Sequence, residues 1–433
     1  ASDGTLTTTQ TVAITVTNVN EAPAFTSGAT ATVAENISTS TAVYTAVATD
    51  VDAGTTLTYT LSGTDAALFD IDSATGVVTF KASPNYESPS DSGADNVYNV
   101  TVGASDGTNT TTQAVAITVT NANEAPTFTS GATATVAENI STSTAVYTAV
   151  ATDVDAGTTL TYTLSGADAA LFNIDSATGV VTFKASPNYE SPADAGGNNV
   201  YDISVSASDG TLTTTQAVAI TVTNVNEAPT FTSGSTATVS ENVSTSTAVY
   251  TAAATDVDAS TTLTYTLSGA DAALFDIDSS TGVVTFKASP NYESPADAGG
   301  NNVYDISVSA SDGTLTTTQA VAITVTNVNE APAFTSGATA TVAENISTST
   351  AVYTAAATDV DAGTTLTYTL SGTDAALFNI DSSTGAVTFK ASPNYESPTD
   401  SGADNVYNVT VGASDGTLTT TQAVAITVTN VNE

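Results

Sequence analysis

Cysteine, histidine, tryptophan and methionine are absent from the 433 residues of this chain, and lysine, present four times, is its only cationic residue. Without cysteine there are no disulfides, so an extracellular chain must be stabilised in another way. Without histidine or cysteine there is little to hold zinc or copper, and no serine stands beside a histidine base. No run approaches 18 consecutive apolar residues, so we expect no membrane insertion in this segment. These absences argue against an enzyme and against a membrane-spanning protein.

The charge is strongly one-sided. The chain has 44 acidic residues and a formal net charge of −40. Nucleic acid and anionic membrane surfaces are bound by clustered cations, so both are excluded as expected partners. Carboxylate and amide oxygens are abundant, and these hard ligands suit calcium or magnesium.

The hexapeptide Asn-Val-Asn-Glu-Ala-Pro, at Asn224–Pro229, recurs along the chain. Its glutamate stands at positions 21, 124, 227, 330 and 433, a spacing of 103 residues. Such a period indicates a tandem array of domains. The number of domains is then given by the number of periods and not by the length of the chain. We expect a last strand and linker at 1–21, followed by full units at 22–124, 125–227, 228–330 and 331–433. Because the chain begins inside a unit and has no methionine, we expect it to be an excerpt of a longer protein.

Within one unit the hydrophobic pattern is that of β-strands. Tyr201, Ile203 and Val205 alternate with polar residues, and no helical period persists. Seven strands are expected at about 127–136, 145–152, 160–165, 171–174, 180–185, 200–207 and 213–224, joined by turns. This pattern predicts an all-β fold, an antiparallel β-sandwich of immunoglobulin-like kind. The expected core residues are Tyr147, Tyr162, Leu164, Leu171, Phe172, Ile174, Phe183, Tyr201, Ile203 and Ile220.

The carboxylates follow five recurring motifs. Every one of the 13 glutamates lies in Val-(Ala/Ser)-Glu-Asn, in Pro-Asn-Tyr-Glu-Ser or in the joint Asn-(Val/Ala)-Asn-Glu. Many aspartates lie in Thr-Asp-Val-Asp or in Ala-Ser-Asp-Gly. Other aspartates, such as Asp168 and Asp175, stand in turn contexts, and we expect them only to make turns.

These motifs resemble those of cadherin repeats, in their bacterial, cadherin-like form. Ala-Glu-Asn is similar to the family's Pro-Glu-Asn, Asn-Tyr-Glu to Asp-Arg-Glu or Asp-Tyr-Glu, and Asp-Val-Asp to Asp-x-Asp. Ala-Ser-Asp-Gly is similar to Ala-x-Asp-x-Gly, and the joint resembles the linker Asp-x-Asn-Asp-Asn-Ala-Pro. All five occur in the family's order throughout the chain. The resemblance implies seven-stranded Greek-key sandwiches in an elongated rod, with calcium between successive repeats.

The resemblance also implies which residues bind calcium. At each joint the upper repeat would supply two glutamates and the linker, and the lower repeat three aspartates. The first joint would comprise Glu35, Glu87, Asn123 and Glu124 with Asp153, Asp155 and Asp209. The second would comprise Glu138, Glu190, Asn226 and Glu227 with Asp256, Asp258 and Asp312, and the third Glu241, Glu293, Asn329 and Glu330 with Asp359, Asp361 and Asp415. Asp3, Glu21, Asp50, Asp52 and Asp106 belong to the start of the chain, and Glu344, Glu396 and Glu433 to its end.

Two departures from the family pattern lower the charge of each joint. Asparagine replaces the family's usual aspartate at 85, 188, 291 and 394, and again at the first linker position, 121, 224, 327 and 430. The linker is also one residue shorter. Asparagine offers a carbonyl oxygen without charge, so each joint has six carboxylates. We expect two or three Ca²⁺ ions per joint, and a hinge where calcium is absent.

The loop Ser186–Asn199 is rich in proline, glycine, aspartate and asparagine. Asp194 in this loop, and Asp91 and Asp95 in the first unit, are candidates for an extra ion. The alternative is a solvated acidic loop.

The expected function is that of a calcium-rigidified extracellular extender in a large, bacterial, adhesin-type surface protein. It would hold a terminal domain away from the cell, with neighbouring repeats and calcium as its partners. The alternative is a structural subunit of an extracellular filament or coat, in which other copies are partners. Direct homophilic adhesion is a third hypothesis, but adhesion by strand exchange uses a tryptophan anchor that this chain lacks. Paired carboxylates occur in glycoside hydrolases, but their recurrence at every joint favours a structural ion.

Overall fold

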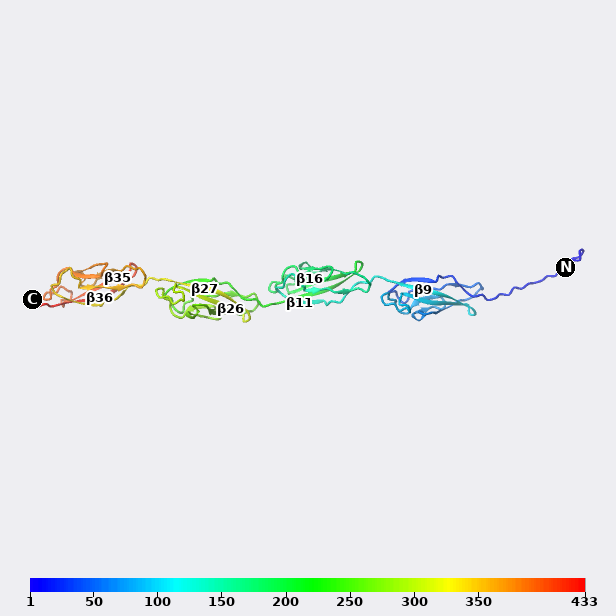
Figure 1. Cartoon of the computed structure of the whole chain (residues 1–433), viewed down its shortest axis with the longest axis horizontal. Helices are drawn as coiled ribbons and strands as arrows, with labels where there is room; N and C mark the ends of the chain where they lie inside the picture. The colour runs from blue at the N-terminus through cyan, green and yellow to red at the C-terminus, as the bar shows by residue number, and fades with distance from the viewer. Residues whose placement is uncertain (433) are drawn as a thin grey trace. The chain divides into compact units, whose positions relative to one another are not determined.

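A computed structural model describes residues 1–432. It divides into two compact units, Ala1–Val225 and Asn226–Glu433, which are described separately. Figure 1 shows two β-sandwiches in each unit. The helices within residues 1–432 are 3₁₀ turns of three residues, none long or apolar enough to cross a bilayer.

In the first unit, the second repeat illustrates the fold. One sheet has the order β11-β18-β17-β14, a second has the order β12-β16-β15, and β10 pairs with β13. The elements are β10 (Thr127–Phe128), β11 (Thr133–Ala137), β12 (Tyr147–Thr148), β13 (Ala151–Thr152), β14 (Thr161–Ser165), η2 (Ala169–Leu171), β15 (Phe172–Ile174), β16 (Val180–Phe183), β17 (Val200–Ser208) and β18 (Thr213–Thr223). The first repeat has β1 (Ala24–Phe25), β2 (Thr30–Ala34), β3 (Tyr44–Thr45), β4 (Ala48–Thr49), β5 (Thr58–Ser62), η1 (Ala66–Leu68), β6 (Phe69–Ile71), β7 (Val77–Phe80), β8 (Val97–Ser105) and β9 (Thr110–Thr120).

The second unit repeats this order of elements. Its first sandwich has β19 (Thr230–Phe231), β20 (Thr236–Ser240), β21 (Tyr250–Thr251), β22 (Ala254–Thr255), β23 (Thr264–Ser268), η3 (Ala272–Leu274), β24 (Phe275–Ile277), β25 (Val283–Phe286), β26 (Val303–Ser311) and β27 (Thr316–Thr326). Its second has β28 (Ala333–Phe334), β29 (Thr339–Ala343), β30 (Tyr353–Thr354), β31 (Ala357–Thr358), β32 (Thr367–Ser371), η4 (Ala375–Leu377), β33 (Phe378–Ile380), β34 (Ala386–Phe389), β35 (Val406–Ser414) and β36 (Thr419–Thr429). The longest pairs, β26 with β27 and β35 with β36, run side by side in Figure 1.

The expected all-β sandwich is confirmed, with one difference in strand direction. The strand expected at 127–136 is two strands, because β10 pairs with β13 while β11 pairs with β18. The pairing of β11 with β18 is parallel. The chain therefore changes partner between β10 and β11, so the sandwich is mixed rather than wholly antiparallel. Hydrophobic alternation predicts which face of a strand is buried, but it carries no information about the direction of the neighbouring strand.

The core of the second repeat is built by the alternation that the sequence predicts. Seven of the expected core residues are buried, and Leu164, Leu171 and Ile174 are half-buried against them. Phe172 lies 4.4 Å from Phe183 between ring centroids, and the Tyr201 ring meets Phe183 edge-on at 5.1 Å. Such aromatic contacts add about 0.5–1.5 kcal/mol each to the burial of the rings. The same triad recurs in the other three repeats.

Two aspartates hold the loop 186–199 against the sandwich. Asp168 is 3% exposed, and its carboxylate accepts hydrogen bonds from the backbone N–H groups of Ala195 and Asp202, both at 2.7 Å. The expectation that Asp168 only makes a turn was therefore wrong. Asp194 is 6% exposed and accepts from Asn198 and Asn199 within its own loop, both at 3.0 Å. Asp194 is therefore buried and not a solvated carboxylate, and these two donors offset the cost of its burial.

Asp91 in the first repeat closes its loop in the same way. It is 6% exposed and accepts from the backbone N–H groups of Asp95 and Asn96, both at 3.1 Å. Asp95 in turn accepts from Val97 N–H at 3.1 Å. These bonds give Asp91 and Asp95 a structural role in the loop, and the binding of an extra ion there stays a prediction.

Candidate metal centre at the joints between repeats

The first joint lies within the first unit, and Glu35 is at its centre. Glu35 follows β2 and is 3% exposed. One carboxylate oxygen accepts a hydrogen bond from Tyr86 N–H at 2.7 Å, and the other accepts from Ala122 N–H at 3.0 Å. The side chain therefore links the start of the repeat to the Pro-Asn-Tyr-Glu loop and to the linker.

Glu35, Glu87 and Glu124 come together at this joint. Each offers a carboxylate oxygen, and these oxygens all lie within 4.8 Å of one another. Burial raises the pKa of Glu124, as do the negative charges of Glu35, Asp155 and Glu87. Burial also raises the pKa of Glu87, and the negative charges of Glu35 and Asp155 raise it further. Three carboxylates this close require a counter-charge, and no lysine pairs with them within residues 1–432.

The lower repeat contributes Asp155, which is 9% exposed. Its Oδ1 accepts from the Asn121 side-chain amide at 2.6 Å, and its Oδ2 accepts from the backbone N–H of Glu124 at 2.9 Å. Its own N–H donates to Asp153 at 2.9 Å. The Asp-Val-Asp loop is thus bonded to the linker by both oxygens of one carboxylate.

Asp209 is the third aspartate of the lower repeat at this joint. Its Oδ2 accepts from the amide of Asn123 at 2.6 Å, and its Oδ1 accepts from Thr211 and Leu212 N–H, both at 2.6 Å. The bond from Asn123 is the largest cause of the lowered pKa of Asp209. The structure therefore brings the seven sequence-predicted residues of the first joint to the boundary between the two repeats.

The second unit contains the third joint, with the same arrangement. Glu241 accepts from Tyr292 and Val328 N–H, both at 2.8 Å, and forms a cluster with Glu293 and Glu330. The corresponding bonds on the lower repeat run from Asn327 and Glu330 N–H to Asp361, at 2.7 and 2.9 Å, and from Asn329 to Asp415 at 2.7 Å. Because the same contacts recur at two joints, they follow from the shared motifs and not from the local sequence of one joint.

The predicted residues of the second joint belong to two different units. Within the first unit, Glu138 is 2% exposed and accepts from Tyr189 and Val225 N–H at 2.7 and 2.8 Å. Within the second unit, Asn226 donates to Asp312 at 2.7 Å, and Glu227 N–H donates to Asp258 at 2.8 Å.

The ends of the chain hold partial sets. Asn20 donates to Asp106 at 2.7 Å and Glu21 N–H to Asp52 at 3.0 Å, whereas Asp3 accepts from Thr5 and Leu6 in its own turn. At the other end Glu344 accepts from Tyr395 and Val431 N–H, and Glu396 accepts from Asn430. The predicted ligand Glu433 lies outside the described residues.

The donor set fits a hard divalent cation. It consists of oxygens only, and several are buried carboxylate oxygens that accept no hydrogen bond within residues 1–432. These are Glu124 Oε2 and Asp153 Oδ2 at the first joint, and Glu293 Oε2, Glu330 Oε2 and Asp359 Oδ2 at the third. A buried anionic oxygen without a donor is costly, and calcium ligated by six to eight oxygens would satisfy it.

Asparagines at two positions of the repeat have roles at the joint that the sequence did not predict. Asn36 donates its side-chain amide to Glu124, and Asn242 donates to Glu330 at 2.6 Å, so the residue after each Ala/Ser-Glu orients the joint glutamate. Both have positive φ, 58° in each case, which asparagine tolerates better than most residues. Asn121 was expected to offer an uncharged carbonyl oxygen, and the structure shows that its amide also donates to Asp155. Both asparagines recur in every repeat beside a glutamate motif, and this recurrence is the feature of the sequence from which their roles could have been predicted.

The comparisons with known proteins agree with this geometry. The family model described as Cadherin domain matches four segments, residues 29–120, 132–223, 235–326 and 338–429. Among solved structures, the protocadherin gamma B2 extracellular cadherin domains 1–5 match with a TM-score of 0.62 and 19% identity, over 96% of this chain and 81% of that one. The protocadherin gamma B4 extracellular domain matches with a TM-score of 0.57 and 20% identity, over 97% and 68%. At these identities the structures show the fold alone, whereas the family model covers most of the chain. The chain therefore belongs to the cadherin domain family.

Proposed function

We propose that the repeats form a calcium-rigidified extender of a larger extracellular protein, with the calcium bound at the joints. Tandem cadherin domains indicate an extracellular, adhesion-type region. The observation that carries the proposal is the glutamate cluster at the first and third joints, with buried oxygens that accept no hydrogen bond within residues 1–432. Two or three calcium ions per joint would neutralise most or all of its six carboxylates.

Calcium would act by cross-linking three parts of the chain. Glu35, Glu87 and Glu124 would hold it from the upper repeat and the linker, and Asp153, Asp155 and Asp209 from the lower repeat. Without the ion, each pair of like charges about 4 Å apart costs roughly 1–4 kcal/mol, depending on the local dielectric. Bending at the joint relieves that repulsion. Bound calcium would remove it and fix the angle between repeats, and so hold a terminal domain away from a cell surface.

Calorimetry and small-angle X-ray scattering test the proposal. Titration of the chain with calcium should give two or three ions per joint, and the maximum dimension in calcium should exceed that in chelator. Replacement of Asp155 and Asp361 by asparagine should weaken binding and reduce the calcium-dependent change in dimension. Asp175→Asn is the matched control, because the carboxylate of Asp175 accepts from Ala177 and Thr178 N–H within a turn. A maximum dimension that does not respond to calcium would contradict the extender.

A filament or coat subunit is the second candidate, supported by the outward strand faces. Ser206 and Thr215 hydrogen-bond to each other across β17 and β18, and the outward residues of these two strands are small or uncharged apart from Asp202. One structural neighbour, protocadherin gamma B7 EC3-6, is described as a cis-dimer; it matches with a TM-score of 0.56 and 21% identity. Analytical ultracentrifugation in calcium separates the candidates: a monomer at micromolar concentration supports the extender, and concentration-dependent assembly supports the filament.

A further inference from the structure

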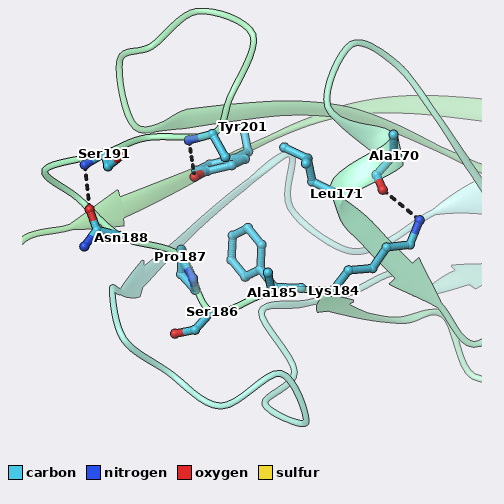
Figure 2. Close-up of a pocket in the computed structure, with 11 residues that line it drawn as sticks. Ala170, Leu171, Lys184, Ala185, Ser186, Pro187, Asn188, Ser191 and Tyr201 are labelled. Atoms are coloured by element: carbon cyan, nitrogen blue, oxygen red, sulfur yellow. Dashed lines mark hydrogen bonds between the residues drawn. The ribbon is translucent and has the colours of Figure 1, made fainter.

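A cavity of about 340 Å³ lies in the second repeat, and its lining includes Asn188 and Ser191 of the Pro-Asn-Tyr-Glu-Ser motif. It is enclosed by the end of η2, the end of β16 and the loop that follows β16. Figure 2 shows Leu171 and Tyr201 on one side of the cavity, Pro187 and Ala185 on the other, and Lys184 along its edge. The lining is mainly apolar, and its volume is within the range of small-ligand sites. A molecule with one ring and a short chain fits such a space.

The charge of the cavity has the opposite sign to that of the chain. Its lining contains Lys184 and no aspartate or glutamate. Lys184 is the only cation in its repeat, since the four lysines stand at 81, 184, 287 and 390. At physiological ionic strength, charges further than about 8 Å are largely screened. A bound anion beside Lys184 would therefore be attracted by its ammonium group more than it is repelled by carboxylates beyond that distance.

Lys184 retains hydrogen-bonding capacity for a ligand. Its ammonium group donates to Ala170 O at 2.7 Å, a bond drawn in Figure 2. An ammonium has three protons, so two remain available. In the first and third repeats, Lys81 and Lys287 lie 3.8 Å from Asp70 and Asp276. The second repeat has Asn173 at that position, and no carboxylate pairs with Lys184 within residues 1–432.

The end of the cavity at Tyr201 disfavours an anion. This preference fixes the orientation of an anionic ligand. There the Tyr201 hydroxyl accepts from Ala193 N–H at 3.3 Å. Burial raises the pKa of Tyr201, and the negative charges of Asp194 and Asp168 raise it further. An anionic group is therefore repelled from the tyrosine end and attracted to the lysine end.

The cavity recurs in the third repeat, so it is a property of the repeat and not of one loop. There it is lined by the equivalent residues Leu274, Phe286, Lys287, Pro290 and Tyr304, with a volume of about 170 Å³. It is smaller, and its lysine lies beside Asp276. Both differences predict weaker binding in the third repeat than in the second.

We propose that the cavity of the second repeat binds a small organic monocarboxylate with an aromatic or compact alkyl body. The apolar body lies between Leu171, Pro187 and Tyr201, and the carboxylate accepts hydrogen bonds from Lys184 Nζ. The cavity of the third repeat binds the same class more weakly.

The test uses the full chain in calcium and the probe 3-phenylpropanoate. Methyl NMR of leucine-labelled protein follows Leu171 and Leu274, which line the two cavities. We expect the Leu171 signal to shift at lower probe concentration than the Leu274 signal. The neutral analogue 3-phenylpropan-1-ol should bind about tenfold or more weakly, as expected for loss of one charge-assisted hydrogen bond.

Three variants separate the role of charge from that of packing. Lys184→Met should abolish or weaken the Leu171 response about tenfold, while Lys184→Arg should retain most of it. Asn173→Asp, which copies the third repeat, should weaken it without removing any lining residue. Circular dichroism checks the fold of each variant. Equal binding of acid and alcohol, no shift of Leu171 at millimolar probe, or an unchanged response in folded Lys184→Met would each overturn the proposal.

Discussion

The Asn121 side-chain amide donates a hydrogen bond of 2.6 Å to Oδ1 of Asp155, across the boundary between two repeats. The neighbouring linker residue, Glu124, donates its backbone N–H to the other oxygen of the same carboxylate. Asn327 and Glu330 hold Asp361 in the same way in the second unit. The linker is therefore attached to the lower repeat by bonds that need no metal. An asparagine at this position replaces a charged ligand with a neutral donor.

Replacing Asn121 by aspartate should make the first joint more dependent on calcium. In chelator the new carboxylate faces Asp155 at hydrogen-bond distance, so the donor is lost and a repulsion of about 1 kcal/mol or more is added. In calcium the same carboxylate is an additional charged ligand, and we expect the Kd of the tightest ion at this joint to fall about tenfold. Calorimetry and thermal melting with and without calcium measure both effects.

Asn173→Asp is the control for this change, because it makes the same chemical substitution at the exposed residue of β15 and outside the linker. It should leave calcium affinity unchanged. Equal calcium affinity of Asn121→Asp and the parent chain would show that position 121 does not face the ions.

Glu35→Ala should destabilise the first repeat even without calcium. The carboxylate is buried and satisfies two backbone N–H groups, those of Tyr86 and Ala122. Removing it leaves both donors without this acceptor, at a cost of about 2–4 kcal/mol, and the relief of its repulsion with Glu87 and Glu124 offsets part of that cost. Chemical denaturation in chelator measures the loss, with Glu21→Ala as control because the Glu21 side chain is exposed. Equal stability of the two variants would mean that Glu35 acts only through calcium.

The sequence predicts the sandwich and the position of the joints well, because both depend on period. Alternation places Tyr201 and Ile203 in the core, and the 103-residue period marks the joints. The family resemblance implied that Glu35 and Glu124 meet at one joint, and the pairing of β2 with β9 brings them there. The parallel pairing of β11 with β18 is not predictable in this way, because strand direction depends on where the chain crosses between sheets. The burial of Asp168 was also missed, since its donors are 27 and 34 residues away in sequence.

The pKa of Asp278 should depend on Ser280. The Ser280 hydroxyl donates to this carboxylate at 2.6 Å, and Thr281 N–H also donates to it, which together lower its pKa to about 2. The second repeat has alanine at the equivalent position, and Asp175 there lacks the hydroxyl bond. Because the folded-state pKa is depressed, the stabilising effect is present above the unfolded value of about 3.9 and is lost as pH falls towards about 2.

Carboxyl-carbon NMR titration of the parent chain and of Ser280→Ala measures this dependence. The variant should show a higher Asp278 pKa, with Asp175 unchanged as an internal control. An unchanged Asp278 titration would indicate that the serine hydroxyl does not donate to the carboxylate in solution.

Gly179→Ala should be among the most destabilising single-methyl additions in the second repeat. Gly179 has φ +71° in the turn between β15 and β16, and a Cβ there would lie 2.3 Å from Ala149 O. The left-handed conformation costs a non-glycine residue about 1–2 kcal/mol, and relieving the backbone clash adds about 1–3 kcal/mol. Gly197→Ala is the matched control: φ is +61°, nothing lies within 4 Å of the added methyl, and the first repeat carries Ala94 at the equivalent position with φ 50°. Urea denaturation should show a loss of about 1 kcal/mol for the control and several times that for Gly179→Ala. Similar losses would mean that the turn moves away from Ala149 at little cost, and that the close packing of β12 on β16 does not depend on glycine.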